Sequence, residues 1–368
     1  MPEKEILFRI RNFTKHFPLK KSSMFQKEQL AVRANENINL DIYKGETLGL
    51  VGESGCGKST FGRTLLQLYP VTRGEVLYYG DDTEQGVDLA KLSRKEMRPY
   101  RKDLQLIFQD PYSSLNPRMT VGQIISEGLL AHNLLKKGED QDAYILKVME
   151  QCGLAPYFVH RYPHQFSGGQ RQRIGIARSV AMRPKFIVAD EPVSALDVSI
   201  QSQIINLLLD LKAEHQLTYL FISHDLSVVK YISDRIGVMY LGNLVELAET
   251  EAIFAHRYHP YTEALFGSIP TTDITEKKEL QVLEGDIPSP IKPPKGCKFH
   301  TRCRYCQERC KQQAPALLEL DPGHKVACHF PLGISEERQR QWEQEQTAAI
   351  QAGQTESSTA GDAAAQAS

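Results

Sequence analysis

The sequence lacks the features that membrane-spanning, secreted and nucleic-acid-binding proteins need. No apolar run in its 368 residues approaches the roughly 18 consecutive residues that cross a bilayer. The first residues, MPEKEILFRIRNFTKHF, contain no apolar stretch of the kind that a signal peptide carries. The 44 basic and 45 acidic residues nearly cancel, so no overall charge favours DNA or RNA. We therefore expect a cytoplasmic protein that reaches a membrane only by docking on a partner.

Cysteine is also scarce until the C-terminal part of the chain. Of the seven cysteines, four fall in CKFHTRCRYCQERC (297–310), and Cys328 follows them. Disulfides are uncommon in the cytoplasm, so clustered cysteines there indicate metal or redox chemistry.

The chain divides into four zones by composition. Residues 1–268 alternate short apolar runs with amphipathic stretches, which predicts an α/β domain with a mostly parallel sheet. Residues 269–296 are rich in proline and predict a linker. We expect a small cysteine-rich module at 297–332 and a disordered tail at 333–368, because the tail has few bulky apolar residues.

Several buried strands are recognisable within the first zone. TLGLV (47–51), FIVA (186–189) and YLFI (219–222) are short apolar runs of the kind that form the interior of a parallel sheet. Apolar residues at helical spacing over 200–211 predict a helix that connects the last two strands. Alternating apolar residues over 104–108 predict a further strand with one polar face.

A phosphate-binding loop follows the first of these strands. GESGCGKS (52–59) has the P-loop spacing of glycine, four residues, glycine, lysine and serine. Its glycines let successive N–H groups converge on phosphate oxygens, and the following helix adds its positive end. A glycine-rich turn with a chance lysine is the alternative, and the preceding strand argues against it. The ATP-binding residues predicted from this motif are Gly52, Glu53, Ser54, Gly55, Cys56, Gly57, Lys58, Ser59 and Thr60.

Two roles within this loop follow from its chemistry, and a second motif supplies the acidic residues. Lys58 is expected to reach the β- and γ-phosphates, and the Ser59 hydroxyl to ligate Mg²⁺. Asp190 ends the strand in FIVADE, at the sheet edge where α/β folds bind ligands, and is the expected acidic partner of the metal. Glu191 is then the candidate that orients or deprotonates the attacking water. A simple acidic turn after a strand is the alternative.

A second anion site is predicted at FSGGQRQRIGIAR (166–178). Ser167 is a good N-cap, and two glycines open a helix whose N-terminus is free of bulky side chains. One chain therefore carries two predicted phosphate-binding sites but only one P-loop.

This motif resembles the LSGGQ signature of the ATP-binding subunits of ABC transporters, with Phe166 in the place of leucine. In that family two subunits pair head to tail, and each signature closes over the nucleotide of the other. The resemblance implies a P-loop fold with an antiparallel β subdomain and a helical subdomain at about 110–182. The residues that it assigns to the partner's ATP are Ser167, Gly168, Gly169 and Gln170.

The other motifs of the family occur in the expected order. Gln109 in IFQDP resembles the Q-loop glutamine that contacts Mg²⁺ and senses the membrane subunits. Asp197 in SALD resembles the D-loop residue at the dimer contact, and His224 in ISHD the switch histidine that holds the γ-phosphate. Phe17, with His16 as the alternative, corresponds to the aromatic residue that stacks on adenine.

The longer matches resemble one branch, the oligopeptide and dipeptide permease ATPases, most closely the F-type oligopeptide permease ATPase. FQDPYSSLNPRMTVGQII, DEPVSALDVSIQ and LEGDIPSPIKPPKGCKFHTRC carry this resemblance, which covers residues 5–332. It implies an ATPase that powers uptake of oligopeptides or dipeptides from the cytoplasmic face of the plasma (inner) membrane. The implied partners are a second, related ATPase, two membrane subunits and, indirectly, a peptide-binding protein. A permease for another small solute and a soluble ABC ATPase are the alternatives.

The same resemblance gives the cysteines a ligand set. Cys297, Cys303, Cys310 and Cys328 match the four cysteines of the permease ATPases, and Cys306 falls outside the pattern. Four thiolates suit a [4Fe–4S] cluster or zinc, and reduced thiols without metal are the third possibility. The irregular spacing, with only one C-x₂-C pair, favours the cluster, and we expect its role to be structural.

Overall fold

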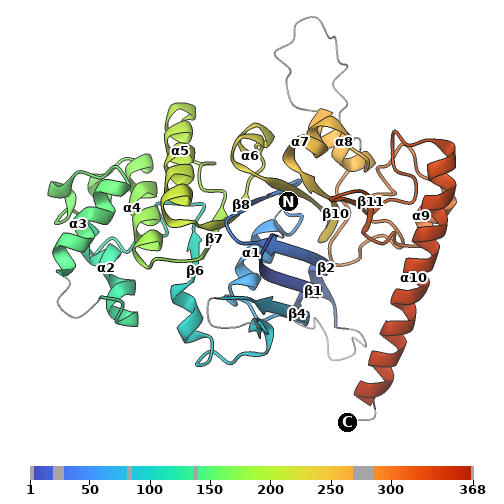
Figure 1. Ribbon diagram of the computed structural model, residues 1–368, viewed down its shortest axis with the longest axis horizontal. Helices are drawn as coiled ribbons and strands as arrows, with labels where there is room; N and C mark the ends of the chain where they lie inside the picture. Colours follow the sequence, from blue (N-terminus) through green and yellow to red (C-terminus); the bar gives the residue numbers. More distant parts are fainter. Residues whose placement is uncertain (1–3, 20–28, 81–84, 136–139, 268–284, 366–368) are drawn as a thin grey trace, which may run out of the picture. The chain divides into compact units, whose positions relative to one another are not determined.

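The computed structural model describes residues 4–19, 29–80, 85–135, 140–267 and 285–365 (Figure 1). The chain forms two compact units. The first contains Met1–Lys15, Asn35–Val51 and Lys58–Asp234, and the second contains His16–Ala34, Gly52–Gly57 and Arg235–Ser368.

A parallel sheet forms the centre of the first unit. Its strands are β3 (Thr47–Val51), β8 (Thr218–Ile222), β7 (Phe186–Asp190) and β6 (Leu104–Ile107), paired in that order and all parallel. Strands β3, β7 and β8 are buried at every position, as their continuous apolar sequences require. The predicted strands and the predicted parallel pairing are therefore confirmed.

Helices cover both faces of this sheet. Gly62 of α1 (Lys58–Leu65) lies so close to the sheet that a Cβ there would be 2.7 Å from Val188 and 3.2 Å from Ile222. Gly49 of β3 makes the same kind of approach to α6 (Leu226–Ile232). Leu50 is the register partner of Ile222, so Gly49 points to the opposite face from α1. The connecting helix predicted over 200–211 is α5 (Val198–His215).

The first unit also contains the two expected subdomains. An antiparallel sheet has the order β2 (Ala31–Tyr43), β1 (Ile6–Pro18), β4 (Arg73–Tyr78) and β5 (Val87–Asp88). Within the predicted range 110–182, Figure 1 shows α2 (Val121–His132), α3 (Gln141–Gln151) and α4 (Gly168–Ala181) gathered into one helical group. The short 3₁₀ helices are Leu89–Lys91, Arg98–Lys102, Pro156–Phe158 and Pro163–Gln165.

The second unit is built on antiparallel strands. Strand β9 (Arg235–Tyr240) pairs with β10 (Asn243–Glu249), β10 with β12 (His324–Val326), and β12 with β11 (Leu318–Asp321). Its shorter helices are α7 (Thr250–Ala255), α8 (Pro260–Gly267) and α9 (Glu308–Gln312).

The cysteine-rich region is not the separate module that we expected at 297–332. It contributes β11 and β12 to the sheet of β10, where the buried Glu246 lies 2.7 Å from His324 Nε2. The predicted boundary at 268 therefore cuts through a single packed unit. Most of the expected linker, namely residues 269–284, lies outside the described residues.

The tail that we expected to be disordered, 333–368, contains a helix in the structure, α10 (Glu336–Ala365). Trp342, the single tryptophan, is fully buried in a cluster with Leu320, Val326 and Cys328, and its Nε1–H donates to the Cys328 carbonyl at 2.8 Å. Gln346 bonds to the backbone of Ala316 through both its amide oxygen and its amide nitrogen. The first part of α10 is therefore packed against the rest of the second unit, although the average composition of the segment is that of a disordered chain.

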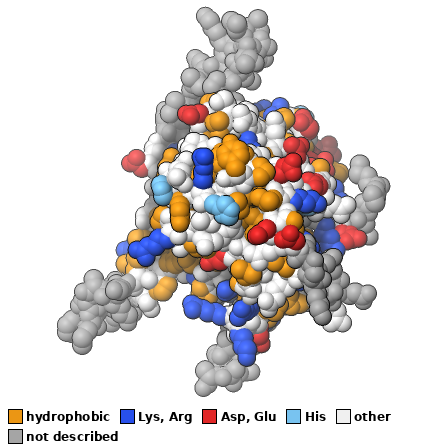
Figure 2. Space-filling model, turned by 90° about the vertical axis from the view of Figure 1, so that its left-hand side faces the viewer, with side chains coloured by type: hydrophobic (Ala, Val, Ile, Leu, Met, Phe, Trp, Pro, Cys, Tyr) orange, Lys and Arg blue, Asp and Glu red, His pale blue; other side chains and the backbone are white. Residues whose placement is uncertain are grey.

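In the part of the chain that the structure describes, no helix is both long and apolar enough to cross a bilayer. On the face drawn in Figure 2, basic and acidic side chains both occur, with hydrophobic ones between them. This mixture agrees with the near-zero net charge of the sequence.

Replacing the buried tryptophan tests the assignment of the tail. We expect Trp342→Ala to lower the free energy of unfolding by about 3 kcal/mol, since it removes a buried ring and leaves a cavity. Urea unfolding followed by circular dichroism measures the change. Ile287→Ala, at a side chain that is 46% exposed, is the control and should change the stability by less than about 0.5 kcal/mol. Equal effects of the two substitutions would show that α10 does not pack as described.

Candidate functional site

The carboxyl end of β7 holds a buried carboxylate. Asp190 is 0% exposed. Its Oδ1 accepts a hydrogen bond of 2.6 Å from Ser59 Oγ, and its Oδ2 accepts bonds of 3.1 Å and 2.9 Å from Nε and Nη2 of Arg63. The structure thus brings together two of the three predicted metal ligands, Ser59 and Asp190.

The three predicted catalytic side chains meet at Glu191, the residue that follows Asp190. Glu191 adopts a left-handed backbone conformation with φ of 48°, and its N–H donates to Ile222 on the neighbouring strand at 3.0 Å. Its Oε2 accepts a hydrogen bond of 2.9 Å from Gln109 Nε2 and lies 3.4 Å from His224 Nδ1. The side chain of His224 is 61% exposed, so the ring is accessible to a ligand. Three segments far apart in the sequence therefore meet at one carboxylate.

The loop 52–57 has the backbone that the motif predicts. Gly52, Gly55 and Gly57 all have positive φ, and a Cβ on Gly52 would lie 2.2 Å from the Met239 carbonyl. Glycine is therefore required at that position by space as well as by conformation. Cys56 is buried, and its carbonyl accepts from the Gly242 N–H at 2.8 Å. This agrees with the expectation that Cys56 contributes backbone only.

The signature helix α4 begins as predicted. Ser167 and Gln170 form a capping box, in which each side chain bonds to the backbone N–H of the other residue. A Cβ on Gly169 would lie 2.6 Å from Ile200 of α5, so this glycine lets the two helices approach. Ser167 is exposed, as is Asp197 at the start of α5. Both residues are thus available to a molecule outside this chain.

The signature helix also contacts the segment after Gln109. Arg178 donates to the Ser114 carbonyl at 2.7 Å, and the Arg171 guanidinium lies 4.2 Å from the ring centre of Tyr112. Gln172 donates to the Phe108 carbonyl at 3.5 Å. The structure therefore joins the predicted Q-loop to the predicted signature helix.

The structure does not distinguish between Phe17 and His16 as the aromatic residue expected to stack on adenine. Phe17 and His16 lie near the end of β1, and both are half-buried. The adenine contact stays a prediction for either residue.

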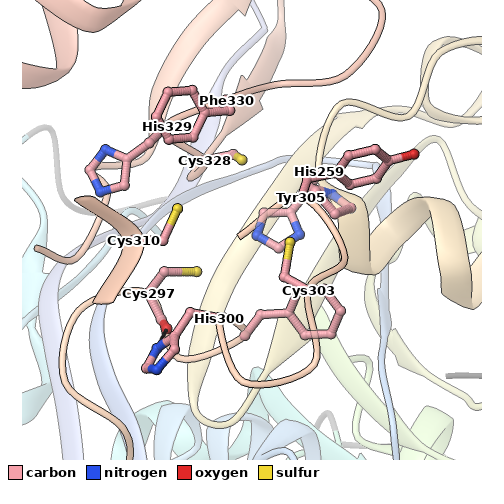
Figure 3. Close-up of a pocket in the computed structure, with 11 residues that line it drawn as sticks. His259, Cys297, His300, Cys303, Tyr305, Cys310, Cys328, His329 and Phe330 are labelled. Carbon is pink, nitrogen blue, oxygen red and sulfur yellow. Dashed lines mark hydrogen bonds between the residues drawn. The ribbon is translucent and has the colours of Figure 1, made fainter. Parts of the chain in front are cut away.

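The four matched cysteines line one small cavity (Figure 3). Cys297, Cys303, Cys310 and Cys328 all line it, and Cys306 is absent from the lining. Burial raises the pKa of Cys297 to about 12 and that of Cys303 to about 11, so both are neutral thiols at pH 7. Burial likewise raises the pKa of Cys328.

The cavity as it stands does not have the shape of a metal site. Its volume is about 10 Å³, close to the minimum that one water needs. Among the described residues, no group of three or more His, Cys, Asp or Glu side chains is arranged to hold a metal ion. Cysteines bind a metal as thiolates, so any metal centre here would require these thiols to lose their protons.

Three functional contacts were missed by sequence reasoning. Arg63 lies four residues after Ser59 on the same face of α1, a spacing that could have indicated its contact with Asp190. Arg302 and Tyr261 bond to Glu53 of the loop. They lie more than two hundred residues further along the chain, and no local pattern marks them.

Comparisons with known proteins agree with this architecture. Residues 35–194 match the family profile described as ABC transporter, and residues 245–310 match the oligopeptide/dipeptide transporter C-terminal region. The chain is 50% identical over 329 residues to the oligopeptide transport ATP-binding protein AppF of Bacillus subtilis, covering 89% of this chain and 98% of the relative. It is 48% identical over 322 residues to a putative peptide import ATP-binding protein of Brucella ovis, covering 88% and 97%.

A solved structure shares the fold. The dimeric post-hydrolysis state of the ATP-binding cassette MJ0796, bound to ADP and Pi, aligns with a TM-score of 0.56 and 29% identity. It covers 66% of this chain and 99% of its own. Fold and site together define an ATP-binding cassette with a P-loop. The chain belongs to the ABC transporter ATP-binding proteins, in the branch with the oligopeptide/dipeptide transporter C-terminal region.

A double-mutant cycle measures the contact at the buried carboxylate. We expect Arg63→Gln and Asp190→Asn to be coupled by about 1–3 kcal/mol, because removing only the cation leaves a buried carboxylate with too few partners. The Arg63 side chain is 33% exposed, and solvent screening keeps the coupling below that of a fully buried pair. Urea unfolding of the four nucleotide-free proteins gives the coupling. Additive effects would contradict the contact.

Proposed function

We propose that this protein is the ATP-hydrolysing subunit of a peptide importer. The observation that carries the proposal is the meeting of Gln109 and His224 at the Glu191 carboxylate, next to Asp190 and its bond from Ser59. Each side chain comes from a different motif of the family. The proposed ATP contacts are Phe17, residues 52–60, Gln109 and Asp190.

The roles follow from the chemistry of the groups. The N–H groups of the loop and Lys58 bind the phosphates. Glu191 orients or deprotonates the attacking water, Gln109 holds the Glu191 carboxylate before substrate binds, and His224 contacts the γ-phosphate.

Mg²⁺ would be held by Ser59, Gln109 and Asp190. Hydroxyl, amide and carboxylate oxygens are the hard ligands that this ion prefers, and the bond between Ser59 and Asp190 shows that the first and third already lie together. When bound, the ion neutralises charge on the phosphate oxygens. In the structure Gln109 donates to Glu191 and Arg63 to Asp190. Both donors leave an oxygen available to the ion, the amide oxygen of Gln109 and Oδ1 of Asp190.

We propose a head-to-tail pair with a second, related ATPase. Ser167, Gly168, Gly169 and Gln170 would contact the partner's ATP, and Asp197 would lie at the dimer contact. The exposure of Ser167 and of Asp197 supports this arrangement, and MJ0796 is a relative solved as a dimer. Two membrane subunits would dock at the Q-loop segment 110–122, on the cytoplasmic face of the plasma membrane. A peptide-binding protein would act through those subunits.

The peptide substrate is carried over from the relatives, whose names specify oligopeptide transport and peptide import. No residue of this chain contacts the solute in the proposed arrangement. A dipeptide or other small-solute permease of the same branch is the second candidate, and uptake assays with labelled solutes distinguish them.

For the cysteine cavity we propose a structural [4Fe–4S] cluster held by Cys297, Cys303, Cys310 and Cys328. The donor set and the convergence of these four residues on one cavity support it. Zinc is the alternative. The irregular spacing of the cysteines along the chain, with only one C-x₂-C pair, favours the cluster over zinc.

Changing the proposed base tests the hydrolytic role. We expect Glu191→Gln to leave ATP binding intact and to lower turnover by about 10²–10⁴-fold, because the amide cannot accept a proton. ATPase activity of the assembled transporter, with the two composite sites assayed separately, measures this. Glu251→Gln, at an exposed residue of α7, is the control and should retain full activity. Unchanged turnover of the Glu191 variant would exclude the role.

Metal analysis of anaerobically purified protein tests the cluster. We expect brown protein with about four irons per chain. Cys303→Ser should lose the iron, whereas Cys306→Ala should keep it, since Cys306 does not line the cavity. Colourless protein with one zinc, or loss of the metal in Cys306→Ala, would contradict the cluster.

A further inference from the structure

The second residue of the phosphate loop is held by the cysteine segment. Arg302 Nη1 donates to Glu53 Oε2 at 2.7 Å, and Nη2 donates to Oε1 at 3.1 Å. The contact is a bidentate ion pair, which is the strongest geometry available to an arginine and a carboxylate. The Arg302 side chain is 5% exposed, so this is not a solvated surface pair of negligible strength.

Further contacts join the same two segments. The backbone N–H of Glu53 donates to the Tyr261 hydroxyl at 2.8 Å. The ring of Tyr261 lies 5.3 Å from that of Phe299, which follows Cys297 by two residues and is buried. Lys298 donates to the Leu241 carbonyl at 2.8 Å, next to the Gly242 N–H that bonds to the loop. Each of these contacts lies within the second unit.

The charge of Glu53 gives the ion pair a consequence for ATP. A carboxylate in a loop that binds phosphates repels them, unless a cation neutralises it or turns it away. Arg302 neutralises the Glu53 carboxylate through its two bonds. A loop rich in glycine also loses much conformational freedom when its N–H groups converge, and a fixed second residue reduces that loss.

We propose that Arg302 is a positioning residue for ATP binding, which neutralises the Glu53 carboxylate and holds it so that it does not oppose the phosphates. The inference rests on the proposed ATP site at 52–60. It assigns a function to the C-terminal region that neither hydrolysis nor a structural metal requires.

A double-mutant cycle on ATP affinity tests the proposal. We expect Arg302→Gln to raise the dissociation constant for a fluorescent ATP analogue by about tenfold, because the Glu53 carboxylate then faces the phosphates unneutralised. Glu53→Gln removes the carboxylate that Arg302 neutralises and is the second arm of the cycle. Adding Glu53→Gln to Arg302→Gln should recover most of the lost affinity. Additive losses, or an Arg302→Gln effect below twofold, would overturn the proposal.

Matched variants separate positioning from folding. Arg304→Gln removes the neighbouring exposed ion pair with Glu263 and should leave affinity within twofold. Arg302→Lys keeps the positive charge but cannot form the bidentate contact, so its dissociation constant for the ATP analogue should be intermediate. The metal content of Arg302→Gln should equal that of the unchanged protein. If metal and affinity are lost together, Arg302 supports the fold of the segment and not the loop, and the proposal fails.

One further variant distinguishes this inference from the function on which it rests. Lys58→Ala should abolish binding of the ATP analogue if the loop is the ATP site. Unchanged binding in Lys58→Ala would reject the ATP site and the inference together. Lost binding in Lys58→Ala with normal binding in Arg302→Gln would reject the inference alone.

Discussion

The buried carboxylate of Asp190 is the constraint on which the site depends. A carboxylate without solvent exposure must be paired and hydrogen-bonded, and here Ser59 and Arg63 supply the partners. Its burial follows from its place at the end of β7, in the middle of four parallel strands. The same strand end fixes Glu191, whose backbone bonds to β8 and whose side chain collects Gln109 and His224. The position of β7 in the sheet therefore determines where the side chains of Asp190 and Glu191 lie.

The phosphate loop is supported by a different set of contacts. Residues 52–57 bond to the backbone at Gly242, to Tyr261 and to Arg302, all in the second unit. The region beyond the nucleotide-binding core is thus part of the support of the phosphate loop. It contributes strands to the sheet of β10 and side chains to the loop.

Sequence predicted the parts of the fold that local pattern determines. The apolar runs at 47–51, 186–189 and 219–222 could only be strands, and Ser167 before two glycines marked the start of α4. Local sequence pattern did not predict the parts of the structure that depend on contacts between distant residues. Trp342 anchors a helix in a stretch of disordered composition, and Arg302 meets Glu53 across most of the chain. The cysteine segment looked independent because sequence does not show that β12 pairs with β10.

The most direct test of the account is the Mg²⁺ dependence of ATP binding. Titration calorimetry with and without Mg²⁺ would be compared for the unchanged protein and for Asp190→Asn. The account predicts that Mg²⁺ tightens ATP binding to the unchanged protein and has little effect on the variant, since the carboxylate is the one charged protein ligand proposed for the ion. Equal tightening in both proteins would contradict it.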